Sequence, residues 1–142
     1  MSSATRFVII DDDVLNNKIC TVTLRKIFHD ADIKTFLDSV AGFDYIAAEY
    51  ASNDHDDNLV LFLDLTMPAM DGWEFLERFE LLDEKVKKRV RIYVLSSSDY
   101  KKDIDKARAN KHVVHYLIKP FTKKTIRLIT VSLGKEYNEV EG

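Results

Sequence analysis

The sequence predicts an α/β fold, a doubly wound, five-stranded parallel sheet with helices on both faces. Strand-like and helix-like segments alternate about five times along the chain, as repeated βαβ units with right-handed crossovers do. Two of the strand-like segments, residues 7–10 and 59–63, are unbroken apolar runs. Short runs without polar alternation are typical of strands buried on both faces. Acidic residues follow both runs directly, so two strands of the sheet should end in carboxylates.

The composition fits a single domain with its own core, which we expect over residues 6–135, followed by a weakly patterned tail, 136–142. The net charge of -3 offers no basic face for nucleic acid. The single cysteine excludes an internal disulfide. No apolar run approaches the roughly 18 residues of a membrane span, and acids 11–13 stand where a signal peptide would be apolar. We therefore expect a cytoplasmic protein with no nucleic-acid or membrane partner.

The first helix is expected from Val14 to about Phe28, with Asp13 as its N-cap or as a first-turn charge. It carries two apolar stripes, one of Leu15, Ile19 and Val22 and another of Cys20, Leu24 and Ile27. Two stripes exceed what one buried face needs. Either this helix is unusually enclosed, or part of it is a docking surface for another protein.

Residues 33–37 form the next predicted strand, and residues 39–51 the next helix, which carries Phe43, Ile46 and Ala47 inward. The polar stretch 52–58 is interpreted as a solvated loop. Its acids and His55 could suggest a metal site, but consecutive acids in a loop are usually just solvated.

The third strand, 59–63, is followed by turn residues, Pro68 and the pair Asp71-Gly72. A helix is then predicted over 73–82, with Phe75, Leu76 and Phe79 at helical spacing as core residues. Residues 85–89 are interpreted as a basic, solvated connection.

The remaining elements are a strand over 90–95, a charged helix over about 99–110 and a strand over 113–118. Lys119-Pro120 follows the last strand, and Thr122 is expected to cap a final helix that runs to about Leu133. His112 and His115 are interpreted as partly exposed strand residues and not as ligands.

Polar side chains should gather at the carboxyl edge of this sheet, where doubly wound folds bind ligands: Asp11, Asp12, Asp64, Ser96 and Lys119. Three neighbouring carboxylates cannot all stay ionised without a cation. Carboxylate oxygens suit Mg²⁺ better than zinc. A lysine and a hydroxyl opposite the metal would hold an anion with several oxygens, such as a phosphoryl group.

Four stretches of the sequence, VIIDDDVLN, LFLDLTMPAMDGWEFL, VLSSSD and YLIKPF, resemble the receiver domains of two-component response regulators, the family of the chemotaxis protein CheY. The resemblance covers nearly the whole chain, from about Phe7 to the final helix. It implies a flavodoxin-like (CheY-like) sheet with strand order 2-1-3-4-5.

The resemblance implies that Asp64 attacks the phosphorus of a phosphohistidine on a partner kinase and becomes an aspartyl phosphate. Asp12 would bind Mg²⁺ directly, together with Asp64 and the backbone carbonyl of Thr66. Asp11 would position the metal mostly through water. Lys119 would contact the phosphoryl oxygens.

Ser96 would close onto the phosphoryl group, and Tyr116 would be the switch aromatic that turns inward when Ser96 moves. A strand tyrosine that never moves is the alternative for Tyr116. Receivers have a cis bond at the position of Lys119-Pro120. Thr66 and Ser98 stand where the family tunes the lifetime of the phosphate, and the stretch 112–115 departs from the family pattern.

The resemblance also implies partners. A sensor histidine kinase or a histidine phosphotransfer protein would dock on the first helix and on the loop after Pro120. A downstream protein, or a second copy in a homodimer, would bind the face of the 99–110 helix, the last strand and the last helix.

Our leading hypothesis is a stand-alone receiver, because we expect no room for an effector domain. It would catalyse only its own phosphorylation and dephosphorylation and is not otherwise an enzyme. A pseudo-receiver used as a constitutive interaction module is one alternative, although it would not need all five edge residues. A Mg²⁺-dependent phosphohydrolase of the haloacid-dehalogenase type is another, although Thr66 stands where that type places a second aspartate.

Overall fold

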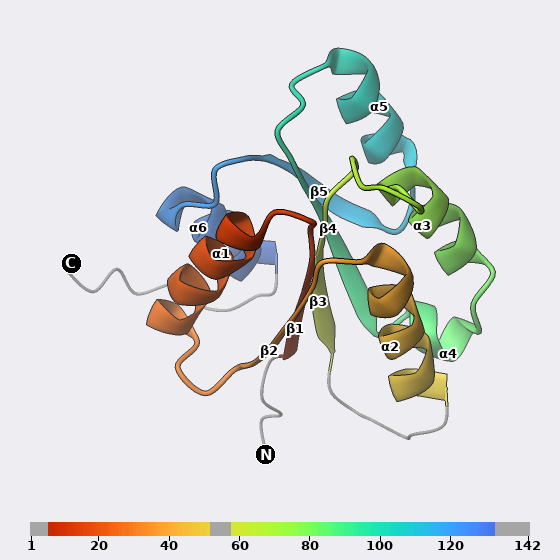
Figure 1. Ribbon diagram of the computed structural model, residues 1–142, viewed down its shortest axis with the longest axis horizontal. Helices are drawn as coiled ribbons and strands as arrows, with labels where there is room; N and C mark the ends of the chain where they lie inside the picture. Colours follow the sequence, from red (N-terminus) through yellow and green to blue (C-terminus); the bar gives the residue numbers. More distant parts are fainter. Residues whose placement is uncertain (1–5, 52–57, 133–142) are drawn as a thin grey trace.

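The computed structural model of the protein describes residues 6–51 and 58–132. Its centre is a five-stranded parallel sheet in the order β2-β1-β3-β4-β5 (Figure 1). The strands are β1 (Arg6–Ile10), β2 (Asp32–Phe36), β3 (Leu59–Leu63), β4 (Val90–Ser96) and β5 (Val113–Ile118). The predicted fold class and strand order are confirmed.

Helices cover both faces of the sheet (Figure 1). They are α1 (Val14–Ile27), α2 (Ser39–Ala51), α3 (Gly72–Glu80), α4 (Glu84–Lys87), α5 (Lys101–Ala109) and α6 (Lys123–Ser132). In Figure 1, α1 and α6 lie on one side of the sheet, and α2, α3, α4 and α5 lie on the other. The crossovers return each strand in the same direction, so the carboxyl ends of all five strands meet at one edge.

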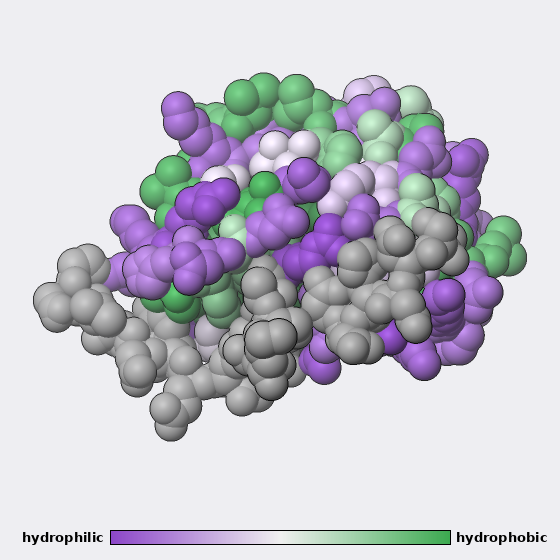
Figure 2. Space-filling view, turned by 90° about the horizontal axis from the view of Figure 1, so that it is seen from below, coloured by the Kyte–Doolittle hydropathy of each residue, from purple (hydrophilic) through white to green (hydrophobic). Residues whose placement is uncertain are grey.

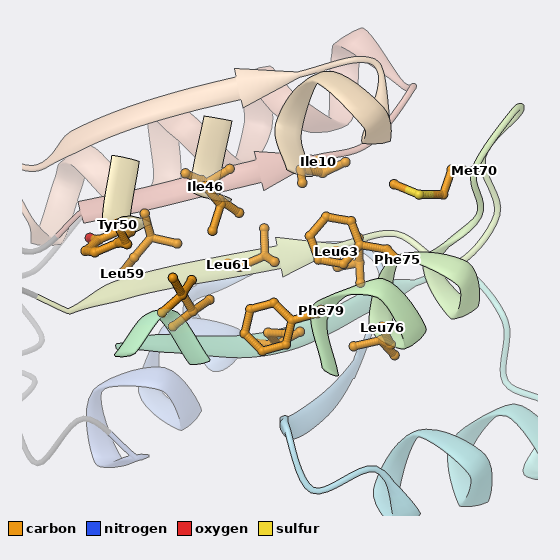
Figure 3. Close-up of a cluster of buried hydrophobic side chains, with 14 of the residues drawn as sticks. Ile10, Ile46, Tyr50, Leu59, Leu61, Leu63, Met70, Phe75, Leu76 and Phe79 are labelled. Atoms are coloured by element: carbon orange, nitrogen blue, oxygen red, sulfur yellow. The ribbon is translucent and has the colours of Figure 1, made fainter. Parts of the chain in front are cut away.

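The central strand, β3, is buried on both faces. All five residues of β3 are buried, and its side chains point alternately to the two faces of the sheet. Leu61 packs with Phe75 and Phe79 of α3 in one core (Figure 3). Phe62 packs into the other core, which Phe7 also joins. The short apolar runs in the sequence therefore reflect enclosure from both sides.

Helix α1 begins where the sequence predicted, because the Asp13 carboxylate accepts hydrogen bonds from the backbone N–H groups of Leu15 and Asn16. Its two apolar stripes have different environments. Leu24 is fully buried, whereas the side chains of Leu15 and Val22 are 65% and 51% exposed. The helix is therefore not enclosed, and the docking surface on its outer stripe stays a prediction.

Helices α4 and α5 differ from the sequence prediction. Residues 84–87 form the short helix α4 and not merely a connection, because the Asp83 carboxylate caps it and Val86 is buried beneath it. Helix α5 begins at Lys101, two residues after Asp99. Helix α6 begins directly after Thr122, where the sequence predicted, and the Thr122 backbone N–H donates to Thr125 Oγ1 at 3.1 Å.

Two further predictions concern the histidines next to the last strand, and the polar loop and tail of the chain. His112 lies in the turn before β5 and its ring pairs with Glu80, so it is not a strand residue, while His115 is exposed within β5. Most of the predicted loop 52–58 and all of the predicted tail 136–142 lie outside the described residues.

The amino ends of the strands lie at the opposite edge of the sheet from the polar side chains. Figure 2 shows the molecule from the side of these amino ends, with hydrophilic side chains over the middle of the described surface and hydrophobic ones along one rim. Within residues 6–51 and 58–132, no helix is long and apolar enough to cross a membrane.

Candidate functional site at the carboxyl edge of the sheet

The strand register brings the predicted site residues together. Strands β1 and β3 pair in parallel, with Ile10 opposite Leu63, so Asp11 and Asp64 emerge next to each other. The backbone N–H of Asp64 donates to the carbonyl of Ile10 at 3.0 Å, which fixes this pairing one residue beyond the strands. On the other side, the N–H of Lys119 donates to the carbonyl of Ser96 at 2.8 Å.

Three carboxylates form a compact cluster at this edge. Ligand oxygens of Asp11, Asp12 and Asp64 all lie within 4.8 Å of one another. Asp11 and Asp64 are buried, and Asp12 is exposed. The cluster therefore has a buried floor and one acid that faces solvent, which leaves a path for an ion or a ligand to enter.

Asp11 is held by several donors. Its Oδ1 accepts the Asp13 backbone N–H at 2.9 Å, and its Oδ2 accepts the Asn16 amide at 2.8 Å. Lys119 Nζ lies 2.7 Å from the same Oδ2, and the Asn17 amide donates to the Asp11 carbonyl at 3.0 Å. The bonds to Oδ1 and Oδ2 fix the orientation of the Asp11 side chain, and the Asn17 bond fixes its backbone.

Sequence reasoning missed Asn16 and Asn17. Both side chains are almost fully buried, at 7% and 5% exposure, although they lie near the start of a helix that was expected to bury apolar residues. In the sequence, these residues appear as a pair of amide side chains in the first turns of the helix that follows the acids. Buried amides are hydrogen-bonded as a rule, so a partner such as Asp11 could have been anticipated.

Asp64 has weaker support from its neighbours. Its Oδ1 accepts the Thr66 backbone N–H at 3.2 Å, and Lys119 Nζ lies 3.6 Å from its Oδ2. Burial and the nearby charge of Asp11 raise the pKa of Asp64 to about 6, against the opposing effects of Lys119 and the Thr66 N–H. The neighbours of Asp64 therefore neutralise its negative charge only in part, and a bound cation would neutralise it further.

Lys119 is the nearest cation to both buried acids. Burial lowers its pKa, but Asp11 and Asp64 outweigh that effect and the net direction is upward. The ammonium group therefore stays charged at neutral pH. One lysine between two carboxylates leaves the cluster of three acids with a net negative charge.

The donor set fits Mg²⁺. It consists of carboxylate oxygens, the ligands that hard divalent cations prefer, and it provides no sulfur or imidazole. A divalent cation would also offset the charge repulsion that raises the pKa of Asp64. Thr66 is exposed and adjacent to the cluster; the role of its carbonyl as a further ligand stays a prediction.

Gly72 allows the helix after the site to approach the end of β3. Its backbone N–H donates to the Leu65 carbonyl at 2.9 Å. A Cβ added to Gly72 would lie 2.7 Å from the Asp64 carbonyl oxygen and 2.8 Å from Leu65 Cα. Only a residue without a side chain fits there, and Ala69 in the same loop adopts a left-handed φ of 67°.

The residues of the predicted switch lie on the β4 and β5 side. Ser96 is buried, and its Oγ accepts the Ser98 backbone N–H at 3.1 Å. Tyr116 is half-buried, and its hydroxyl donates to the Ser98 carbonyl at 2.7 Å. Lys119-Pro120 is a cis peptide bond. The movements of Ser96 and Tyr116 stay predictions.

Comparisons with known proteins agree with this geometry. A family model described as the response regulator receiver domain matches residues 7–130. The structure is similar to a response regulator receiver protein from Dyadobacter fermentans, with 30% identity, a TM-score of 0.79, and coverage of 94% of this chain and 100% of the other. It is also similar to a two-component response regulator from Cytophaga hutchinsonii, with 25% identity, a TM-score of 0.81, and coverage of 95% and 100%.

The Thermotoga maritima response regulator TrrA, crystallised in complex with Mg²⁺-BeF, shares the fold with 19% identity, a TM-score of 0.65, and coverage of 91% of this chain and 98% of the other. A comparison with curated proteins gives no significant match. The acidic cluster of Asp11, Asp12 and Asp64 is typical of a phosphoacceptor site. The chain belongs to the response regulator receiver domain family.

Proposed function

We propose that the protein accepts a phosphoryl group onto Asp64 in a Mg²⁺-dependent reaction and signals by changing which protein it binds. The observation that carries this proposal is the grouping of three carboxylate oxygens within 4.8 Å, with Lys119 Nζ 2.7 Å from Asp11 and 3.6 Å from Asp64. A nucleophile, a cation site and a fixed positive charge then share one edge of the sheet.

In the proposed reaction, an Asp64 carboxylate oxygen attacks the phosphorus of a phosphohistidine. The new P–O bond forms as the P–N bond breaks, and the electron pair returns to the imidazole nitrogen, which takes up a proton. Lys119 stabilises charge on the phosphoryl oxygens. Mg²⁺ held by Asp11, Asp12, Asp64 and the Thr66 carbonyl would supply further charge neutralisation when bound. Attack of water on the phosphorus later restores Asp64.

Ser96 and Tyr116 carry the proposed response. The Ser96 hydroxyl is buried at the end of β4 and has a free proton to donate to a phosphoryl oxygen once it rotates toward the site. Because Tyr116 is bonded to the loop that follows Ser96, movement of that loop would alter the environment of the tyrosine.

Receiver domains in general interact with histidine kinases or phosphotransfer proteins and with downstream targets. We propose the exposed stripe of α1, with Leu15 and Val22, as the surface for the phosphoryl donor. The face of α5, β5 and α6 would bind the target or a second copy, and the exposure of Ile118 and Leu128, 48% and 44%, supports this. Such a protein would act in the cytoplasm.

The test is the intact mass of the protein after incubation with a small acyl phosphate and Mg²⁺. A receiver gains one phosphoryl group, and Asp64→Ala abolishes the gain. A pseudo-receiver gains none, while a phosphohydrolase turns over added phosphate esters. Asp71→Ala is the matched control, because that acid is an N-cap of α3 and not a member of the cluster; it should leave the mass gain intact.

A further inference from the structure

The short segment between β4 and α5 is organised around Ser98. Its backbone N–H donates to Ser96 Oγ at 3.1 Å, and its carbonyl accepts the Tyr116 hydroxyl at 2.7 Å. Its own hydroxyl donates to Asp103 Oδ2 at 2.7 Å. One residue is thus bonded to the proposed phosphate-sensing hydroxyl, to the proposed switch aromatic and to a helix.

Hydrogen bonds of Ser98 hold the start of α5. The N-cap residue of α5 is Tyr100, and within the described part of the chain its side chain makes no capping hydrogen bond. Ser98 Oγ instead accepts the Tyr100 backbone N–H at 3.3 Å while it donates to Asp103 in the first turn. The Ser98 hydroxyl therefore links the loop after β4 both to the N-cap residue of α5 and to its first turn, and it satisfies the Tyr100 N–H, one of the unpaired donors at the start of the helix.

We propose that Ser98 and Asp103 form the mechanical link that transmits movement of Ser96 to α5. The proposal rests on the proposed function, since Ser96 must move toward a phosphoryl group. When Ser96 Oγ moves toward the phosphoryl group, its hydrogen bond pulls the Ser98 backbone N–H in the same direction. The Ser98 hydroxyl, which is bonded to Asp103, transmits this displacement to the first turn of α5. Ser98 is a positioning residue; it takes no part in the transfer of the phosphoryl group.

Asp103 is suited to this role by its own position. As an acid in the first turn of α5 it is favoured by the helix dipole, and its hydrogen bond to Ser98 is charge-assisted and therefore strong. Tyr116 donates its hydroxyl to the Ser98 carbonyl, and its contact with α5 is apolar, through the cluster that contains Ala107. Truncation of the Ser98 side chain would remove the hydrogen bonds between the loop and the start of α5 and leave the Tyr116 bond in place.

The protein contains its own reporter of α5. Trp73 is the single tryptophan, and it lies on α3, which faces α5. Lys106 of α5 places its ammonium group 4.3 Å from the centre of the Trp73 ring, and both residues line a groove between the two helices. A displacement of α5 moves a positive charge relative to the indole, so the emission of Trp73 should change.

The experiment measures the phosphoryl uptake and the Trp73 emission of the same samples, with an acyl phosphate and Mg²⁺ as reagents. Ser98→Ala and Asp103→Ala should take up the phosphoryl group and lose most of the emission change, and the double variant should lose no more than either single one. Ser98→Thr keeps the hydroxyl and should restore the response. The matched controls are Ser97→Ala, at the exposed neighbour, and Asp105→Ala, which removes the exposed Lys101–Asp105 ion pair of the same helix; both should behave as wild type.

Each contrary outcome has a distinct meaning. A wild type that takes up no phosphoryl group overturns both the proposed function and this inference. A phosphorylated wild type without any change in Trp73 emission overturns only the inference, as does a full change in phosphorylated Ser98→Ala. Loss of phosphoryl uptake in Ser98→Ala would assign Ser98 to the acceptor reaction itself and also contradict the link.

Discussion

The centre and the edge of the sheet differ in how they hold the residues at their carboxyl ends. All five residues of β3 are buried, and β1 and β3 pair in continuous register. Strand β5 exposes Val114, His115 and Ile118, and its register with β4 shifts between Ile92 and Tyr93. The acids follow the enclosed strands. Of the proposed switch residues, Ser96 ends the buried strand β4, and Tyr116 lies on the partly exposed strand β5.

This difference predicts that one part of the site is fixed and that the other can move. Displacement of Asp11 or Asp64 would require repacking of a core that is enclosed on both faces, and close-packed cores resist that. Displacement of the Ser96 hydroxyl or of Tyr116 would require exchange of a few hydrogen bonds, such as those to Ser98, each with a small net contribution to stability. A rigid acceptor beside a mobile sensor is the arrangement that a phosphorylation switch needs.

The largest expected effect comes from Phe62, in the central strand β3. Its ring packs against Phe7, Tyr93 and Phe121, so Phe62→Ala should lower the free energy of unfolding by about 3–5 kcal/mol. Ile118→Ala at the edge, where the side chain is 48% exposed, should cost about 1 kcal/mol or less. Urea unfolding of both variants measures the contrast, and equal losses would contradict the distinction between centre and edge.

Glycine substitutions probe the fixed part next to the acids. Gly72→Ala presses a Cβ against backbone atoms of Asp64 and Leu65 and should cost about 1–3 kcal/mol. Gly42→Ala meets the flexible end of the Ile10 side chain at 2.5 Å, and a gain of roughly 1 kcal/mol in helix propensity offsets part of that contact. Urea unfolding should rank Gly72→Ala as the more destabilised variant, and the opposite ranking would refute the tight packing at the site.

The raised pKa of Asp64 predicts a pH-dependent stability when Mg²⁺ is chelated. Because burial and Asp11 raise this pKa from 3.8 to about 6, the folded state binds the proton more tightly than the unfolded state. The associated stability is complete below the unfolded pKa and is lost as the pH rises through about 6. Asp64→Asn removes that loss, so it should be more stable than wild type by on the order of 1–2 kcal/mol at pH 8.

The same comparison at pH 3, below the unfolded pKa of 3.8, should give nearly equal stabilities, because Asp64 is then mostly protonated in both states. Unfolding by urea at the two pH values checks the prediction. A variant that is stabilised equally at both would point to a packing effect and not to the charge of Asp64.

The smallest effect concerns Lys119. Its ammonium group lies 2.7 Å from Asp11 and competes with a cation for that carboxylate, so Lys119→Ala should bind Mg²⁺ at least as tightly as wild type while its phosphoryl-dependent response weakens. Calorimetric titration measures the affinity, and Lys124→Ala, at an exposed lysine of α6, is the control. A large loss of Mg²⁺ affinity in Lys119→Ala would contradict the assignment of Lys119 to the phosphoryl oxygens.

Local sequence signals were sufficient for the sheet and for most of the site. The apolar run Leu59–Leu63 and the acids after it specify a buried strand and its polar end, because side-chain period and turn residues act over a few positions. Helix α4 escaped prediction because a four-residue helix has too few positions to show a period; its Asp83 cap and the buried Val86 became meaningful only in the fold.

What the sequence by itself determined is the order of the elements and the chemical types that stand at the ends of the strands. Only the tertiary structure decided which of these groups touch. Asn16 on Asp11, Lys119 between two acids and Ser98 between Tyr116 and Asp103 are contacts of this kind. Their distances depend on how separate crossovers pack against one sheet, and no local pattern along the chain encodes them.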